Sequence, residues 1–138
     1  MIHYQKHTDI DKQAWDERLA ASSFPTVYAM SWYLDLVSPG WEALVDEDRG
    51  AQFPLTHRRK FGFRYLFQPA FTQQLGLFAP EPTDHLLIEF LKAIPSSFRL
   101  IEIQLNESNV RPLMGALQLL LEEKWKLKNE FHKLLMDS

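Results

Sequence analysis

Apolar residues recur at helical spacing in three segments of the first 94 residues. In the first segment Trp15 and Leu19 are four residues apart, and Asp9 or Asp11 stands where a capping residue is expected. In the second segment Asp35 is expected to point outward or to cap locally. Serine, proline or glycine follows each segment and interrupts the helix. We therefore predict helices over residues 9 or 11 to 22, 28–37, and 83 or 84 to 94.

The segments between and after these helices carry short apolar runs or alternate with a period of two, which predicts strands. The clearest alternation is in FRLIEIQL, where Glu102 and Gln104 share one face and the isoleucines occupy the other. Asp46–Gly50 has the composition of a turn between the first two strands. The predicted strands cover residues 41–45, 51–60, 65–67, 74–78 and 98–105.

The last part of the chain admits two interpretations. Arg111–Glu123 has helical spacing, with Pro112 in the first turn, where proline is tolerated. Residues 125–136 could extend this helix, but WKLKNEFH alternates at period two, and we predict a strand there. The element order predicts one α+β domain over residues 1–138, with a mixed, mainly antiparallel sheet flanked by helices.

The composition is that of a globular protein, with 46% hydrophobic and 24% charged residues. The net charge of −3 argues against an overall electrostatic grip on nucleic acid. Cysteine is absent and the five histidines show no metal-ligand spacing, so we expect no metal site. The N-terminus has no signal-peptide core and no apolar run approaches about 18 residues, so we expect a soluble, cytoplasmic protein. The four tryptophans are expected in the core.

The segment YLFQPAFTQQLGLF combines aromatic and apolar residues with three amides, Gln68, Gln73 and Gln74. Buried amides need hydrogen-bond partners, because burying them unpaired is costly. Either these amides bond internally around the proline bend, or they line a pocket for a peptide or another uncharged polar substrate. Gly76 stands between two large apolar residues, where a backbone can approach another group closely.

Polar residues also gather at the C-terminal end of the last predicted β-strand before residue 106. Glu102 and Gln104 share one face of it, and Glu107 and Asn109 follow just beyond. Such positions are typical of ligand clefts in α/β proteins. Glu102 could serve there as general base for an amine nucleophile, and Gln104 as a substrate ligand. For Asn109 we favour a second interpretation, the N-cap of the next helix.

A basic run with interleaved aromatic residues, HRRKFGFR, occupies residues 57–64. Single-stranded nucleic acid or a nucleotide diphosphate would suit such a surface. An exposed edge strand, whose charges discourage pairing with other strands, is the simpler explanation.

The order of elements resembles the GNAT acyltransferase fold. Five local sequences resemble the first half of a Fem-type aminoacyl- or acyltransferase, a protein with two GNAT-like domains in tandem. These sequences are WYLDLV (32–37), GWEALV (40–45), AQFPLTHRRKFG (51–62), YLFQPAFTQQLGLF (65–78) and IEIQLNESN (101–109). The resemblance covers nearly the whole chain and about half of such a protein. It implies acetyl-CoA or another acyl-CoA as cofactor and a small amine or a peptide as substrate.

In GNAT enzymes, backbone N–H groups of a glycine-containing loop at a helix start hold the acyl-CoA pyrophosphate. Gln73 and Gly76 match the first two positions of that pattern, which is roughly Gln/Arg-x-x-Gly-x-Gly/Ala. Phe78 replaces the small residue, and Pro80 and Pro82 remove two amide donors before the helix. The first half of tandem Fem-type proteins is usually the less catalytic one, so these departures agree with a domain that is not catalytic by itself.

Three expectations of function follow. The first is a GNAT-like domain that binds a ligand or completes another chain without catalysing transfer alone. The second is an active acyl-CoA-dependent N-acyltransferase, with Glu102 as base and the four glutamines named above lining the cleft. The third is a nucleotide- or RNA-binding module built on residues 57–64. An isolated half is also expected to expose apolar surface and to form a homodimer that stands in for the tandem.

Overall fold

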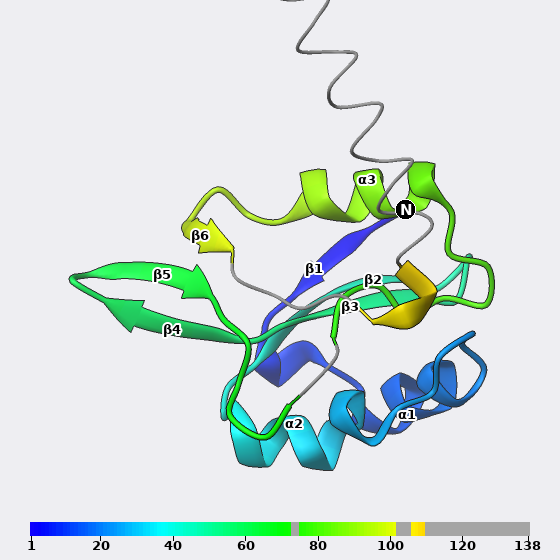
Figure 1. The fold of residues 1–138 in the computed structure, drawn as a ribbon, viewed down its shortest axis with the longest axis horizontal. Helices are drawn as coiled ribbons and strands as arrows, with labels where there is room; N and C mark the ends of the chain where they lie inside the picture. The colour runs from blue at the N-terminus through cyan, green and yellow to red at the C-terminus, as the bar shows by residue number, and fades with distance from the viewer. Residues whose placement is uncertain (73–74, 102–105, 110–138) are drawn as a thin grey trace, which may run out of the picture.

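The structure is a computed structural model that describes residues 1–72, 75–101 and 106–109 (Figure 1). Within these ranges the helices are α1 (Lys12–Ala20), α2 (Ser31–Val37) and α3 (Asp84–Ala93). The strands are β1 (His3–Gln5), β2 (Glu42–Asp46), β3 (Ala51–Leu55), β4 (His57–Lys60), β5 (Phe63–Leu66) and β6 (Phe98–Ile101). Short 3₁₀ helices span His7–Asp9, Val27–Ala29 and Glu107–Asn109. The described part of the chain is therefore α+β, as predicted.

The three helices predicted before residue 95 are present. Asp11 caps α1, where its Oδ1 accepts the Ala14 N–H at 3.1 Å. Thr83 caps α3 in the same way, since its Oγ1 accepts the Leu86 N–H at 3.2 Å. The second helix begins later than predicted, because the chain first makes a 3₁₀ turn and α2 starts only at Ser31.

β1, β2 and β3 form an antiparallel sheet with β2 in the middle. The predicted turn between β2 and β3 is confirmed: Gly50 has a φ of +60°, and Asp46 Oδ1 accepts the Arg49 N–H at 3.3 Å. The sequence pattern missed β1, because His3–Gln5 is short and polar. Every residue of β2 and β3 is buried, so this sheet is covered on both faces.

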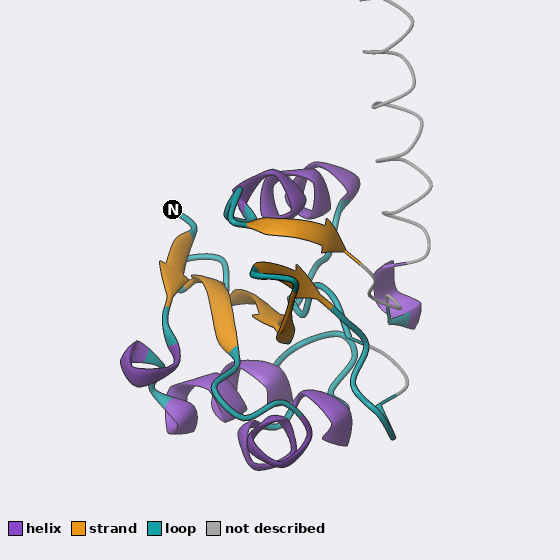
Figure 2. Cartoon of the chain, turned by 90° about the vertical axis from the view of Figure 1, so that its left-hand side faces the viewer, coloured by secondary structure: helices purple, strands orange, loops and turns teal. Residues whose placement is uncertain are grey.

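Two apolar clusters cover the sheet, one on each face (Figure 2). The cluster toward α1 and α2 includes Trp15, Leu34, Trp41, Ala43 and Val45. The cluster toward α3 includes Leu44, Phe53, Leu55, Leu87 and Phe90. Successive residues of β2 alternate between the two clusters because side chains alternate across a strand. The core therefore has three layers, with the sheet between the helices.

β4, β5 and β6 form a second sheet, in which β4 and β5 are antiparallel and β5 and β6 are parallel. The single strand predicted over residues 51–60 is therefore wrong, since the chain changes sheets at Thr56. Thr56 is buried and pairs with Phe67: its Oγ1 donates to the Phe67 carbonyl at 2.7 Å, and its carbonyl accepts the Phe67 N–H at 3.1 Å. Beyond this crossing the β4–β5 hairpin projects from the rest of the fold (Figure 1).

Residues 75–78 do not form the strand predicted over 74–78. Phe78 makes an isolated bridge with Gln52, and Leu75 and Leu77 are hydrogen-bonded by Asn106 and Asn109, as described below. β6 covers the first half of the strand predicted over 98–105. The remainder of that strand, the helix predicted over 111–123 and the strand predicted over 125–136 lie outside the described residues.

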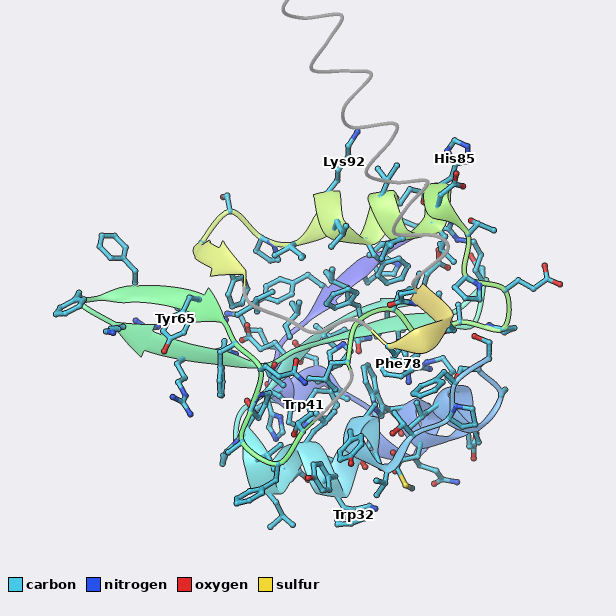
Figure 3. The ribbon with its side chains drawn as sticks, in the orientation of Figure 1. Trp32, Trp41, Tyr65, Phe78, His85 and Lys92 are labelled. Carbon is cyan, nitrogen blue, oxygen red and sulfur yellow. The ribbon has the colours of Figure 1, made fainter. Side chains whose placement is uncertain are left out.

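Trp32 is not a core residue, contrary to the expectation for the tryptophans. It is 50% exposed on the outer side of α2 (Figure 3), whereas Trp15 and Trp41 are fully buried. Trp125 lies outside the described residues.

Candidate functional site

The bend after β5 is fixed by three hydrogen bonds. Gln68 Nε2 donates to the Thr72 carbonyl at 3.0 Å across the bend, and the Thr72 N–H donates to the Pro69 carbonyl at 3.2 Å. From α2, the Tyr33 hydroxyl donates to the Phe71 carbonyl. Gln68 thus bonds internally at the proline bend, which is the first of the two interpretations of the three amides given above. The bend, residues 67–72, is thereby held in one shape against α2.

The Thr72 hydroxyl is the exception within this bend. Thr72 is only 7% exposed, and its Oγ1 has no hydrogen-bond partner within the described ranges. A buried hydroxyl without a partner costs free energy and calls for an explanation. A polar group of a ligand bound beside the bend would satisfy it.

Asn106 and Asn109 take the place of a partner strand for the backbone of Leu75 and Leu77. The Asn106 N–H and Nδ2 both donate to the Leu75 carbonyl, at 2.8 and 3.0 Å, and Nδ2 also lies 3.0 Å from the Leu77 carbonyl. Asn109 Oδ1 accepts the Leu77 N–H at 2.9 Å, and its Nδ2 donates to the Leu77 carbonyl at 2.9 Å. Both asparagines are fully buried.

This asparagine clasp (Asn106 and Asn109) closes the backbone edge at residues 75 and 77 to a ligand. Sequence reasoning missed the clasp, because its partners are about 30 residues away along the chain. The only available signal was a pair of asparagines spaced three apart after a strand. The N-cap role favoured for Asn109 concerns a helix outside the described residues and stays a prediction.

Gly76 is required by its backbone conformation. It is buried with a φ of +103°, which residues with a side chain avoid. Next to it, Phe78 exchanges two backbone hydrogen bonds with Gln52, at 2.8 and 2.9 Å. The glycine in this segment is therefore explained by the fold, without invoking a cofactor.

The structure describes two of the predicted site residues, Gln68 and Gly76. The four others lie outside the described residues: Gln73, Gln74, Glu102 and Gln104. Two surface cavities, of about 390 and 180 Å³, are lined by neither Gln68 nor Gly76. The predicted site as a set therefore stays a prediction.

The larger cavity lies at the start of α3, and carboxylates border it. Glu81 and Glu89 line it together with Arg49. The Arg49 guanidinium is already bound to Glu89 at 2.7 Å and to Asp46 at 2.6 Å. The hydrogen bond from Arg49 holds the pKa of the Glu89 carboxyl below its ordinary value, so Glu89 favours the charged form. The cavity is unsuited to a phosphate.

The first turn of α3 uses its N–H donors internally. The Asp84 carboxylate accepts the His85 N–H at 2.8 Å, and the Thr83 hydroxyl accepts the Leu86 N–H at 3.2 Å. A helix start binds phosphate through free N–H groups and a positive field. Figure 3 shows His85 pointing away from the sheet at this end of α3. No donor of the kind that a pyrophosphate loop needs is left at these two positions.

Asp35 joins three parts of the chain, contrary to the expectation that it points outward or caps locally. It accepts hydrogen bonds from Lys12 Nζ and Trp41 Nε1, both at 2.9 Å, and His7 Nε2 lies 3.9 Å from its Oδ1. Burial alone raises the pKa of the Asp35 carboxyl, but the hydrogen bonds from Lys12 and Trp41 bring it below its ordinary value. The cluster fixes α1 and α2 to the start of β2.

Glu42 links the two sheets. The Tyr4 hydroxyl from β1 donates to its carboxylate, and Arg64 from β5 pairs with the same oxygen. The Arg64 guanidinium lies 4.3 Å from the centre of the Phe98 ring. Burial, with Glu42 beside it, raises the pKa of the Tyr4 hydroxyl. Arg64, one of the basic residues in the run 57–64, is therefore neutralised inside the fold.

Three further findings bear on the class of protein. No group of three or more histidines or acidic residues within the described ranges could hold a metal ion. In the same part of the chain, no helix has the length and apolar character needed to cross a bilayer. Comparison with known protein families, with curated proteins and with solved structures gives no match.

Proposed function

We propose that the chain is a GNAT-like domain related to the first half of Fem-type N-acyl- or aminoacyltransferases. In this proposal it supplies one wall of a substrate site and does not catalyse acyl transfer by itself. The observed order supports the relation, since two helices stand between β1 and the β2–β3 pair of the antiparallel sheet, and α3 and β6 follow. β4 and the second half of β5 lie in two of the local sequences that carry the resemblance, residues 51–62 and 65–78.

The observation that carries the proposal is the Thr72 hydroxyl, which is buried and has no hydrogen-bond partner among the described residues, in a bend that is otherwise held by hydrogen bonds. A rigid bend has little conformational entropy left to lose on binding, so it suits a binding site. Gln73 and Gln74 follow directly in the sequence. A hydroxyl and two amides offer hydrogen bonds without charge, which fits a peptide or carboxamide substrate.

The start of α3 supports the second part of the proposal, the lack of catalysis by the chain alone. Acyl-CoA chemistry in a GNAT-like domain needs a phosphate site between residue 78 and this helix. The two N–H groups at His85 and Leu86 are occupied by side chains, and Glu81 and Glu89 add negative charge. A pyrophosphate would be repelled rather than held there.

The test is a titration of the isotope-labelled 138-residue chain with a short uncharged peptide amide, followed by nuclear magnetic resonance. We expect the amide signals of residues 65–78 to shift at millimolar peptide. Thr72→Val keeps the side-chain shape and removes the hydroxyl. It should raise the free energy of unfolding by about 1 kcal/mol, because a buried unpaired group is lost, and weaken peptide binding about fivefold or more.

A matched control is Gln13→Ala, which removes an exposed amide on α1. It should leave peptide binding unchanged, whereas the double variant Q73A/Q74A should abolish it. Peptide binding that survives Thr72→Val and Q73A/Q74A, or no shift in residues 65–78 of the native chain, would overturn the proposal.

A further inference from the structure

The β4–β5 hairpin concentrates basic residues in a short stretch of the chain. Four of the 15 basic residues and none of the 18 acidic residues lie in residues 57–64. Arg64 is neutralised by Glu42, but Arg58, Arg59 and Lys60 form no ion pair within the described ranges. All three are exposed. Adjacent like charges repel one another, so this arrangement favours an anionic partner.

The hairpin turn also displays an aromatic ring under backbone strain. Phe61 and Gly62 have φ values of +54° and +81°, the pattern of a type I′ hairpin turn, for which asparagine and glycine are the favoured residues. A bulky residue at positive φ is an outlier, and here its ring is 89% exposed. The side chain gains no burial that would offset the strain, which indicates a role outside the fold.

Aromatic and cationic side chains alternate along this surface. Arg58 opposes Tyr65 across the two strands, and its guanidinium lies 4.1 Å from the centre of the Phe67 ring. Lys60 opposes Phe63, which is 55% exposed, and Lys60 Nζ lies 5.7 Å from the Phe61 ring. Figure 3 shows Tyr65 on the projecting hairpin, away from the helical layers.

Edge protection alone does not explain this surface. β4 is an edge strand, and exposed lysine or arginine would discourage strand pairing. Exposed phenylalanines at positions 61 and 63 have the opposite effect, because they make a free edge more adhesive. The combination of cations with exposed rings matches a polymer in which phosphates alternate with aromatic bases.

We propose that one face of this hairpin (Arg58, Lys60, Phe63 and Tyr65), with Phe61 at its turn, binds single-stranded nucleic acid without sequence preference. Arg58 and Lys60 contact phosphates, and the exposed rings stack on bases. The net charge of −3 does not oppose this, because the positive charge is concentrated on a hairpin that projects from the acidic remainder. The inference stands apart from the substrate-site proposal, which rests on the bend at residues 67–72.

The test measures fluorescence anisotropy of a labelled oligouridylate of about 12 nucleotides, titrated with the full chain at several salt concentrations. With two phosphate contacts, the logarithm of affinity should fall against the logarithm of salt with a slope of about −1.4. R58Q/K60Q should weaken binding at least about tenfold at low salt and bring the slope close to zero. The control K6Q/K92Q makes the same change in net charge away from the hairpin and should change affinity less than about twofold.

Phe61→Asn tests the stacking step without threatening the fold, since asparagine accepts positive φ. It should weaken binding about fivefold or more and leave the unfolding temperature equal or higher. The proposal is overturned if R58Q/K60Q binds as well as K6Q/K92Q, or if no oligonucleotide binds at low salt. Binding only to phosphatidylserine vesicles, lost in Phe61→Asn, would equally overturn it and assign the hairpin to a membrane surface.

Discussion

At the scale of residues, side chains replace a strand where the backbone leaves its sheet. The Asn106–Asn109 clasp provides the donors and acceptors that a neighbouring strand would give to Leu75 and Leu77. An asparagine side chain resembles a peptide group, with one carbonyl and two N–H donors, and can therefore stand in for one. This explains how residues 75–77 remain buried without belonging to a strand.

Replacing Asn109 by alanine should be costly for this reason. The change leaves the buried Leu77 N–H unpaired, so we expect the free energy of unfolding to fall by about 1–3 kcal/mol. Urea unfolding measures it. Ser108→Ala, which removes a hydroxyl bonded to the clasp from a half-buried neighbour, serves as control and should cost less. Equal effects of the two changes would contradict the clasp.

Three carboxylates predict how stability depends on pH. Burial alone raises the pKa of the Asp46 carboxyl, but hydrogen bonds from Arg49 bring it below its ordinary value, and Asp35 and Glu89 are also shifted downward. A carboxyl whose folded pKa is depressed stabilises the fold above its unfolded pKa of about 4, and this stability is lost as the pH falls through the folded pKa. Stability should therefore decline as the pH is lowered below about 5.

Asp46→Asn should make that decline shallower, because one of the shifted groups no longer titrates. Asp48→Asn is the matched control, since the Asp48 side chain is 91% exposed. It should leave the slope unchanged. Thermal unfolding of both variants between about pH 3 and 7 measures how steeply stability falls with pH. Parallel curves for Asp46→Asn and the native chain would show that Asp46 does not contribute to the pH dependence.

At the scale of elements, the second sheet depends on one ion pair and one crossing residue. Glu42 on β2 forms an ion pair with Arg64 on β5. Thr56 is the residue at which the chain crosses from the first sheet to the second, and its hydroxyl donates to the Phe67 carbonyl. The Arg64 and Glu42 side chains are 19% and 12% exposed. Removing one member of such a pair leaves a mostly buried charge without compensation.

Arg64→Ala should therefore lower the free energy of unfolding by about 2–3 kcal/mol, below the range for a fully buried pair because of the residual exposure. Arg59 is the natural control, because it lies directly opposite Arg64 in the strand register and is exposed. Arg59→Ala should change stability by no more than about 0.5 kcal/mol. Chemical denaturation that ranks the two variants the other way round would disprove the role given to Glu42.

Local signals predicted the helices well and the strands incompletely. Asp11 and Thr83 were among the predicted N-cap residues, and their side chains cap α1 and α3 in the structure. β1 has only three residues and no apolar pattern, so periodicity had nothing to detect. The strand predicted over 51–60 is interrupted at Thr56, which bonds to Phe67, and the clasp bonds to Leu75 and Leu77. Both features depend on contacts between distant parts of the chain, which local sequence patterns do not predict. The candidate site was predicted as a set of amides, of which the described residues show only Gln68.

At the scale of the whole molecule, the described domain exposes apolar side chains beside α2. Trp32 and Leu36, one helical turn apart, are 50% and 72% exposed. The Tyr33 hydroxyl holds the Phe71 carbonyl, so the 90% exposed Phe71 lies next to the same helix. Such a patch indicates an interaction surface, and a second copy of the chain is the partner that the tandem resemblance suggests.

We expect the chain to form a dimer through this patch. L36K/F71K should shift it to monomer, because two buried charges would replace apolar contacts. Val27→Lys, at a residue 44% exposed on the short 3₁₀ helix before α2, should leave the dimer intact. Sedimentation velocity over a range of concentrations measures the states. A native chain that stays monomeric at high concentration would contradict this expectation.

The measurement that tests the central claim most directly is calorimetric titration of acetyl-CoA into the chain. In the proposed function the domain is GNAT-like, but the His85 and Leu86 N–H groups at the start of α3 are occupied by Asp84 and Thr83 and are not free for a phosphate. We therefore expect no heat of binding and no thermal shift at millimolar acetyl-CoA. Micromolar binding would contradict that proposal, and would show that residues 73–84 hold the cofactor and that the chain is equipped for catalysis by itself.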